Sequence, residues 1–363
     1  MSTPGGDDEP RIPPRPPLPP RTRSDQRQRA GENPPPSSGE SVPPRTGDNL
    51  HAQWQARKAE IETHVSHARD QIDQANERII QRTGRNLVLA VGVGLLFGAV
   101  VVSSLVLAKW SFALIAVAIV ELAIWELVLA LRAGGRKVDL WPQLVVGAAL
   151  VAGGYFADPW LTWVMLFVAV FAVVVWRTFG QMVARDGRIY GDVLTDVLAG
   201  GFVQVYVAFL GAIILMLLRQ PRGEWWVLGF IIVVVVTDTA AYASGLLFGR
   251  GGRHPMAPRV SPKKTWEGFA GAVVGSLAAG ALIGQFMLEI PWWAGLIFGA
   301  VLVASATLGD LGESLLKRDL GIKDMSSWLP GHGGLLDRLD SILPSSVFAL
   351  ALFHILTPLA GAR

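Results

Sequence analysis

From Leu87 to the C-terminus, long apolar runs alternate with short polar segments. About 20 apolar residues are enough for one helix to cross the ~30 Å hydrocarbon core of a bilayer. The pattern therefore predicts an all-α fold, a polytopic integral membrane protein with about nine transmembrane helices. The expected spans are Leu87–Leu107, Ser111–Leu131, Leu140–Phe156, Trp160–Phe179, Val197–Leu218, Trp225–Phe248, Glu267–Leu288, Trp292–Leu311 and Ser341–Leu359.

The segment before these spans has a different pattern. Residues 1–50 are rich in Pro, Arg, Ser and Gly and hold little that could be buried, which predicts a disordered cytoplasmic tail. In residues 51–85, apolar side chains recur at intervals of three and four, which predicts an amphipathic cytoplasmic helix that packs against the membrane domain or the lipid headgroups. Residues 86–363 are then expected to form the polytopic catalytic domain. The apolar positions of the amphipathic segment are Ile61, Val65, Ala68, Ile72, Ala75 and Ile79.

Composition agrees with a membrane protein. The 363 residues are 51% hydrophobic and 17% charged, which is too apolar for an ordinary soluble protein. The formal charge is only +3, and the basic residues sit in particular loops, so nucleic acid is not an expected partner. Cys is absent, which excludes disulfides and thiolate chemistry.

The basic residues also predict an orientation. Most Lys and Arg near the span ends fall on one side of the membrane, and only Lys109, Arg219, Arg222 and Arg363 fall on the other. Because cytoplasmic loops carry the excess of Lys and Arg, we expect the N-terminus and the charged segments in the cytoplasm and the C-terminus outside. The membrane itself is expected to be the cell (inner or plasma) membrane.

One polar stretch, Ser314–Asp340 together with Asp310, interrupts the apolar pattern near the C-terminus. Clustered charges at a membrane boundary indicate a polar site, since each unpaired charge in the bilayer costs about 2.5–3.5 kcal/mol or more. Carboxylates suit Mg²⁺, and Lys and Arg neutralise phosphates. If residues 335–341 begin a helix, Asp337 and Asp340 lie on one face, close enough to share a metal or a metal pair. The alternative is a solvated loop.

The order of residues here resembles the signature of the phosphatidate cytidylyltransferases, also called CDP-diglyceride synthases. A second stretch, from Ala257 to Gly268 with Asp238 upstream, also resembles this family, whereas the first 85 residues do not. The signature positions are Ser314, Lys317, Arg318, Lys323, Asp324, Ser326, Leu329, Pro330, His332, Gly333, Gly334, Asp337, Arg338 and Asp340.

The resemblance implies an enzyme that condenses CTP with phosphatidic acid to give CDP-diacylglycerol and pyrophosphate, with Mg²⁺ as cofactor. The expected partners are CTP, phosphatidic acid and the bilayer, and homodimerisation is left open. His332 would either protonate the leaving pyrophosphate or shape the glycine loop. The implied roles are catalytic for Lys317, Asp324, His332, Asp337 and Arg338; metal-binding for Asp310, Asp337 and Asp340; and substrate-binding for Ser261, Lys263, Lys264, Thr265, Ser314, Arg318, Lys323, Gly333 and Gly334.

Three acidic residues within predicted spans are further candidates. Asp238 marks a site or a helix-bundle contact. Glu121 and Glu126 are expected mainly to hydrogen-bond within the bundle. Two other functions remain open: a CTP-dependent kinase of a polyprenol-type lipid, which would need a base to activate a hydroxyl, and a transporter, which the one-sided clustering of charge disfavours.

Overall fold

The computed structural model describes residues 58, 87–184, 187–249, 254–326 and 333–360. Contacts divide the chain into two units, Met1–Arg69 and Asp70–Arg363. Apart from Lys58, the predicted tail and amphipathic helix lie outside the described residues, so both stay predictions. The description below concerns the second unit alone.

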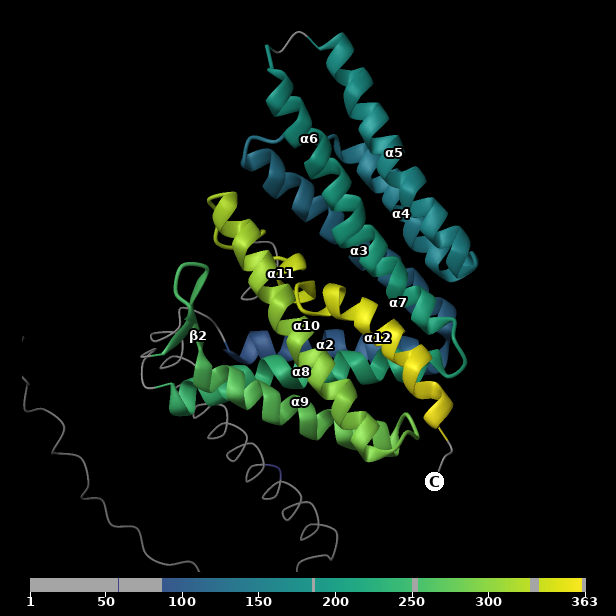
Figure 1. Ribbon diagram of the computed structural model, residues 1–363, viewed down its shortest axis with the longest axis vertical. Coiled ribbons are helices and arrows are strands. Elements are labelled where there is room, and N and C mark those ends of the chain that lie inside the picture. The colour runs from purple at the N-terminus through teal and green to yellow at the C-terminus, as the bar shows by residue number, and fades with distance from the viewer. Residues whose placement is uncertain (1–57, 59–86, 185–186, 250–253, 327–332, 361–363) are drawn as a thin grey trace, which may run out of the picture. The chain divides into compact units, whose positions relative to one another are not determined.

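This unit is built of helices with one small antiparallel hairpin (Figure 1). The hairpin joins β1 to β2, and it pairs Pro255 with Thr265 and Ala257 with Ser261. The elements in chain order are α2 (Leu87–Leu107), α3 (Lys109–Ala133), α4 (Leu140–Phe156), α5 (Pro159–Val183), α6 (Tyr190–Val203), the π-helical η1 (Gln204–Phe209), α7 (Leu210–Leu218), α8 (Gly223–Phe248), β1 (Pro255–Ala257), β2 (Ser261–Thr265), α9 (Trp266–Phe286), α10 (Trp292–Asp319), α11 (Leu336–Leu339), α12 (Ile342–Leu356) and η2 (Thr357–Leu359).

Within the described residues, seven helices are long and apolar enough to cross a membrane. The chain is therefore a multi-pass membrane protein, although the predicted count of nine spans is not confirmed. The two predicted spans outside this group coincide with shorter apolar helices, Gly98–Leu107 and Leu140–Phe156. The seven long helices are Lys109–Ala133, Pro159–Val183, Tyr190–Leu218, Gly223–Phe248, Trp266–Phe286, Trp292–Asp319 and Leu336–Leu359.

Helix α4 connects the two ends of the bundle although it has only 17 residues, or about 25 Å of helix. Just before α4, the backbone N–H of Lys137 donates to Asp196 on α6 at 2.8 Å. Just after α4, the carbonyl of Ala157 accepts from the Arg219 side chain at the end of α7. Because α6, η1 and α7 follow one another as a single 29-residue span, these contacts place α4 beside most of its length.

Asp196 is the centre of a buried charge cluster at one end of the bundle, which we call the Asp196 cluster. Its side chain is 0% exposed and accepts from Arg177 Nη2 at 2.7 Å and Arg188 Nη1 at 2.6 Å. Arg188 Nη2 also donates to the carbonyl of Gly135 at 2.7 Å. The cluster therefore ties the α3–α4 turn, α5 and α6 together.

Two of the four basic residues predicted to lie opposite the main basic group, Lys109 and Arg222, make their contacts together at one end of the bundle. Their ion pairs are Lys109–Glu224 at 2.5 Å and Arg222–Glu289 at 2.6 Å. At the opposite end lie the Asp196 cluster and the C-terminus of α10, where Gly134 packs against the Leu320 side chain. The structure does not assign these ends to the two sides of a membrane.

Small residues bring α9 and α10 close together. A Cβ on Gly280 would collide with the carbonyl of Gly295, and Ser276 Oγ donates to the carbonyl of Gly299 at 2.9 Å. Such small-residue contacts are the usual way that membrane helices pack, because lipid provides no hydrophobic drive between apolar surfaces. This packing fixes the position of α10, whose C-terminal half carries most of the polar site.

Candidate active site

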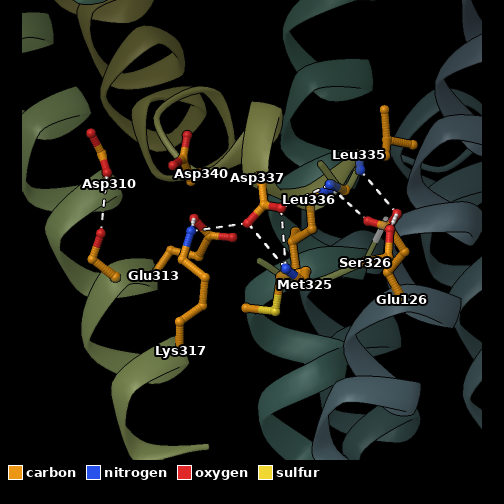
Figure 2. A network of polar contacts seen from close by, with 12 residues as sticks. Glu126, Asp310, Glu313, Lys317, Met325, Ser326, Leu335, Leu336, Asp337 and Asp340 are labelled. Carbon is orange, nitrogen blue, oxygen red and sulfur yellow. Dashed lines mark hydrogen bonds and ion pairs between the residues drawn. The ribbon is translucent and has the colours of Figure 1, made fainter. Parts of the chain in front are cut away.

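Glu126, on α3, holds the backbone on both sides of residues 327–332. Its Oε1 accepts from Ser326 Oγ at 2.6 Å and from the backbone N–H of Leu335 at 2.9 Å, and its Oε2 accepts from the N–H of Leu336 at 2.8 Å (Figure 2). Glu126 is 1% exposed. Glu126 therefore has the expected hydrogen-bonding role. Its partners belong to the stretch that resembles the family signature, at Ser326, Leu335 and Leu336.

Asp337 lies at the meeting point of α10, α11 and this loop. Its carboxylate accepts from Lys317 Nζ at 2.9 Å, from the N–H of Gly334 at 2.8 Å and from the N–H of Met325 at 3.1 Å (Figure 2). The side chain is 8% exposed. Three donors, one of them charged, compensate the removal of this carboxylate from water.

Lys317 joins two carboxylates. Besides Asp337, its Nζ contacts Glu313 Oε2 at 2.9 Å, one helical turn earlier on α10. The ammonium group thus links α10 to α11 in the part of the chain where the signature predicts chemistry.

The hairpin attaches to α10 through two contacts. Lys264 Nζ, on β2, lies 2.5 Å from Asp310 Oδ2. Arg318 Nε, on α10, donates to the carbonyl of Val260 in the hairpin at 3.2 Å. Within α10, Ser314 Oγ donates weakly to the other oxygen of Asp310 at 3.4 Å. The two stretches that resemble the family, far apart in sequence, therefore meet at the C-terminal half of α10.

Two glycines are needed for this geometry. Gly333 has a φ of 81°, in the left-handed region that other residues rarely adopt. A Cβ on Gly334 would approach Glu126 Oε2 at 3.0 Å and Asp337 Oδ2 at 3.1 Å. The bare backbone at residue 334 lets the loop pass between these two carboxylates.

Asp340 lies between α11 and α12, beside Glu313 (Figure 2). Its Oδ1 accepts from the N–H of Ser341 at 2.7 Å. The backbone from Leu335 to Ser341 is helical, as expected, so Asp337 and Asp340 lie about one turn apart. Their contacts differ, because Asp337 contacts Lys317 whereas Asp340 lies beside Glu313. Asp238 on α8 interacts with the Ser341 side chain, so this intramembrane acid borders the same region.

The donor chemistry of the site suits a divalent cation. Asp310, Glu313, Asp337 and Asp340 supply carboxylate oxygens, which Mg²⁺ prefers, and Glu313 Oε1 is a buried oxygen for which the described residues offer no hydrogen-bond partner. Among those same residues, no three acidic or histidine side chains are arranged as a metal cluster. The assignment of Asp310, Asp337 and Asp340 to Mg²⁺ therefore stays a prediction.

The other predicted residues range from buried to exposed. Thr265 is buried and caps α9, accepting from the N–H of Gly268 at 3.1 Å. Ser261 lies at the start of β2, and His332 lies outside the described residues. The exposed members of the predicted set are Lys263, Arg318, Lys323, Asp324 and Arg338, and Asp324 lies near Gly333.

Sequence reasoning missed Glu313, which stands one position before the signature begins. An available signal was its place in an apolar helix four residues before Lys317, where the two side chains share a helix face. Tyr206, on the π-helical segment η1, was also missed. Its hydroxyl is buried, has no hydrogen-bond partner among the described residues, and is acted on by the charges of Glu313, Asp340 and Asp310.

Comparison with known proteins identifies the family of this chain. Residues 88–356 match the model of the family described as the cytidylyltransferase family. A phosphatidate cytidylyltransferase of Mycobacterium bovis is 40% identical over 281 residues, covering 74% of this chain and 88% of the relative. The Mycobacterium leprae protein of that name is 38% identical over 291 residues, 76% and 90% of the two chains. One from Staphylococcus saprophyticus is 40% identical over 158 residues, 43% and 58%. The matched residues include both ends of the site, and the chain belongs to the cytidylyltransferase family.

Proposed function

We propose that this protein transfers the cytidylyl group of CTP to phosphatidic acid, giving CDP-diacylglycerol and pyrophosphate. One observation carries the proposal: two aspartates expected to bind a metal are each paired with a lysine expected to bind phosphate, Asp310 with Lys264 and Asp337 with Lys317. The relatives named as phosphatidate cytidylyltransferases support the same reaction.

These ion pairs suit a site that receives a metal-bound polyphosphate. Without substrate, each ammonium neutralises a partly buried carboxylate. Asp310 and Asp337 would hold Mg²⁺ and Lys264 and Lys317 would hold phosphates, so the local charge would stay balanced when a metal-bound polyphosphate is present. Such an exchange of partners costs less than desolvating unpaired charges would.

The reaction needs little covalent help from the protein. A phosphate oxygen of phosphatidic acid attacks the α-phosphorus of CTP, a new P–O bond forms, and the bond to the β-phosphate breaks to release pyrophosphate. Because the attacking group is already an anion, no strong general base is required. The protein's task is to hold two anions in line and to neutralise their charge.

The described residues divide this task. Lys317 and Arg318, on α10, would bind CTP phosphates, and Lys264, on the hairpin, would bind the phosphate of the lipid. Gly333 and Gly334 allow a phosphate to approach the backbone closely. Asp310, Asp337 and Asp340 would hold Mg²⁺, which supplies charge neutralisation at the phosphates when bound.

Substrate access sets the expected orientation. CTP is a cytoplasmic metabolite, and the site lies at the same end of the bundle as the Asp196 cluster and its basic neighbours. We therefore place this end and the N-terminus in the cytoplasm of a cell membrane, with the C-terminus outside, in accord with the positive-inside rule.

Pyrophosphate release tests the proposal. The purified protein in detergent micelles receives CTP and Mg²⁺ with either phosphatidic acid or diacylglycerol, which lacks the attacking phosphate. We expect one pyrophosphate per CDP-lipid formed with phosphatidic acid and none with diacylglycerol. If diacylglycerol, whose free group is a hydroxyl, were converted to a lipid phosphate with release of CDP, the result would contradict cytidylyl transfer and indicate a lipid kinase.

A further inference from the structure

Glu313 is a buried acid within a membrane-spanning helix. The residue is 1% exposed and its side chain 0%, and it lies in α10 one turn before Lys317. An acidic side chain is costly at such a position, so its presence needs a partner or a function. Its charged partner is Lys317, at 2.9 Å.

Glu313 fixes the direction in which Lys317 points. A lysine side chain is flexible, and its ammonium group has three N–H donors. Two of these are engaged by Glu313 Oε2 and Asp337 Oδ1, each at 2.9 Å (Figure 2). Two acceptors on different elements define the orientation of the group, which leaves the third N–H with a set direction.

We propose that Glu313 is a positioning residue for Lys317: it holds the ammonium group against Asp337 so that the remaining N–H meets a phosphate of CTP. The inference rests on the proposed function. It adds to the site a residue that lies outside the signature stretch and that touches no substrate itself.

The surroundings of Glu313 favour this role over a purely structural one. Its second oxygen, Oε1, is buried with no hydrogen-bond partner among the described residues. The carboxyl groups of Glu313 and Asp340 also lie close together. Two acids placed close together destabilise a fold unless a cation or a proton lies between them. If the contacts of Lys317 with Glu313 and Asp337 served only to join α10 to α11, the closeness of Glu313 to Asp340 would not stabilise the fold.

The first test compares Glu313→Gln with Asp319→Asn. Glutamine keeps the shape of the side chain and removes its charge, whereas Asp319 is an exposed acid on the same helix and is a matched control. We expect Glu313→Gln to raise the KM for CTP roughly tenfold or more and to leave the KM for phosphatidic acid unchanged. The control should match the wild type. A merely structural loss would lower the amount of active enzyme and leave both KM values unchanged.

A double-mutant cycle with Lys317→Ala then decides whether Glu313 acts through the lysine. We expect the double variant to be no worse than Lys317→Ala alone, because the group being positioned is already absent. The proposal would be overturned if the losses of kcat/KM for CTP in the two single variants multiplied in the double variant. Wild-type kinetics in Glu313→Gln would also overturn it. If Glu313→Gln melts too early to assay, the cycle is run with Glu313→Asp, which keeps the charge but shortens the reach, and the same outcomes apply. Failure of the wild type to form CDP-lipid would instead contradict the proposed function.

Discussion

Two buried carboxylates, Asp196 and Asp337, are each held by three or more donors at the same end of the bundle, yet the donors differ in kind. Asp196 is clamped by the guanidinium groups of Arg177 and Arg188 and by the N–H of Lys137. Asp337 is held by one lysine and by the backbone of a glycine-containing loop. The first set ties the α3–α4 turn, α5 and α6 together, and the second set connects α10 and α11 to a loop.

The choice between arginine and lysine explains much of this difference. A guanidinium group binds carboxylates in a fixed planar geometry, whereas an ammonium group on a flexible stem can transfer from one anion to another. The Asp196 cluster is therefore suited to remain unchanged. Asp337 is held by Lys317, whose ammonium group also contacts Glu313, and this flexible side chain is suited to exchange partners when substrate binds.

The largest expected effect is the loss of turnover in Asp337→Asn. An amide keeps the shape of the side chain but lacks the charge that a Mg²⁺–triphosphate complex requires. We expect no measurable CDP-lipid from a protein that still inserts and folds, as judged by its elution profile and melting temperature. Near-normal activity at saturating Mg²⁺ would refute the metal assignment.

The two lysines should separate the two substrates, with an intermediate effect. Loss of one charged contact costs about 1.5–3 kcal/mol, or roughly ten- to a hundredfold. We expect Lys317→Ala to raise the KM for CTP and Lys264→Ala to raise the KM for phosphatidic acid, measured by titrating each substrate in mixed micelles. If both variants changed only the KM for CTP, the hairpin would belong to the nucleotide site. If Lys317→Ala changed neither KM nor kcat, the site would have to be abandoned.

Asp196→Asn should affect stability more than chemistry. Removing the negative charge takes away the carboxylate that pairs with the buried Arg177, and breaking a buried pair in this way costs about 3–5 kcal/mol. We expect a lower melting temperature in detergent, with kcat per folded protein within a few-fold of the wild type. A severe loss of kcat without a change in melting temperature would show that the two clusters do not differ as described.

The smallest effect is expected from removal of residues 1–49. None of these residues takes part in the resemblance to the family, and their composition cannot form a packed site. Specific activity in detergent should stay within a few-fold of the full chain. Loss of most activity from a well-folded truncation would assign the tail to the mechanism.

Hydropathy predicted the helical membrane architecture well, since apolar runs record burial in lipid directly. It could not settle the number of spans. Helix α4 has only 17 residues, and its passage between the two ends follows from contacts at Lys137 and Ala157 that no local pattern reveals. Likewise, the π-helical segment at Gln204–Phe209 has no signal in the apolar periodicity.

The site was predictable where residues lie close in sequence and less so where packing brings them together. The signature identified Lys317, Asp337 and Gly334, which the structure joins. It did not reveal that Glu126, about 200 positions upstream, holds the loop, because backbone amides and a serine hydroxyl, which carry no sequence signal of their own, donate to it. Thr265 was assigned to substrate on its hydroxyl alone, and the structure uses that hydroxyl as a helix cap.

The fate of the CTP phosphates tests the central claim most directly. Purified wild-type protein and Asp337→Asn are incubated in parallel with phosphatidic acid, Mg²⁺ and CTP labelled on either its α- or its γ-phosphorus. The account predicts that the wild type transfers only the α-label to lipid and releases the γ-label as pyrophosphate, and that Asp337→Asn transfers neither. Transfer of the γ-label to lipid, or unchanged α-transfer by the variant, would contradict it.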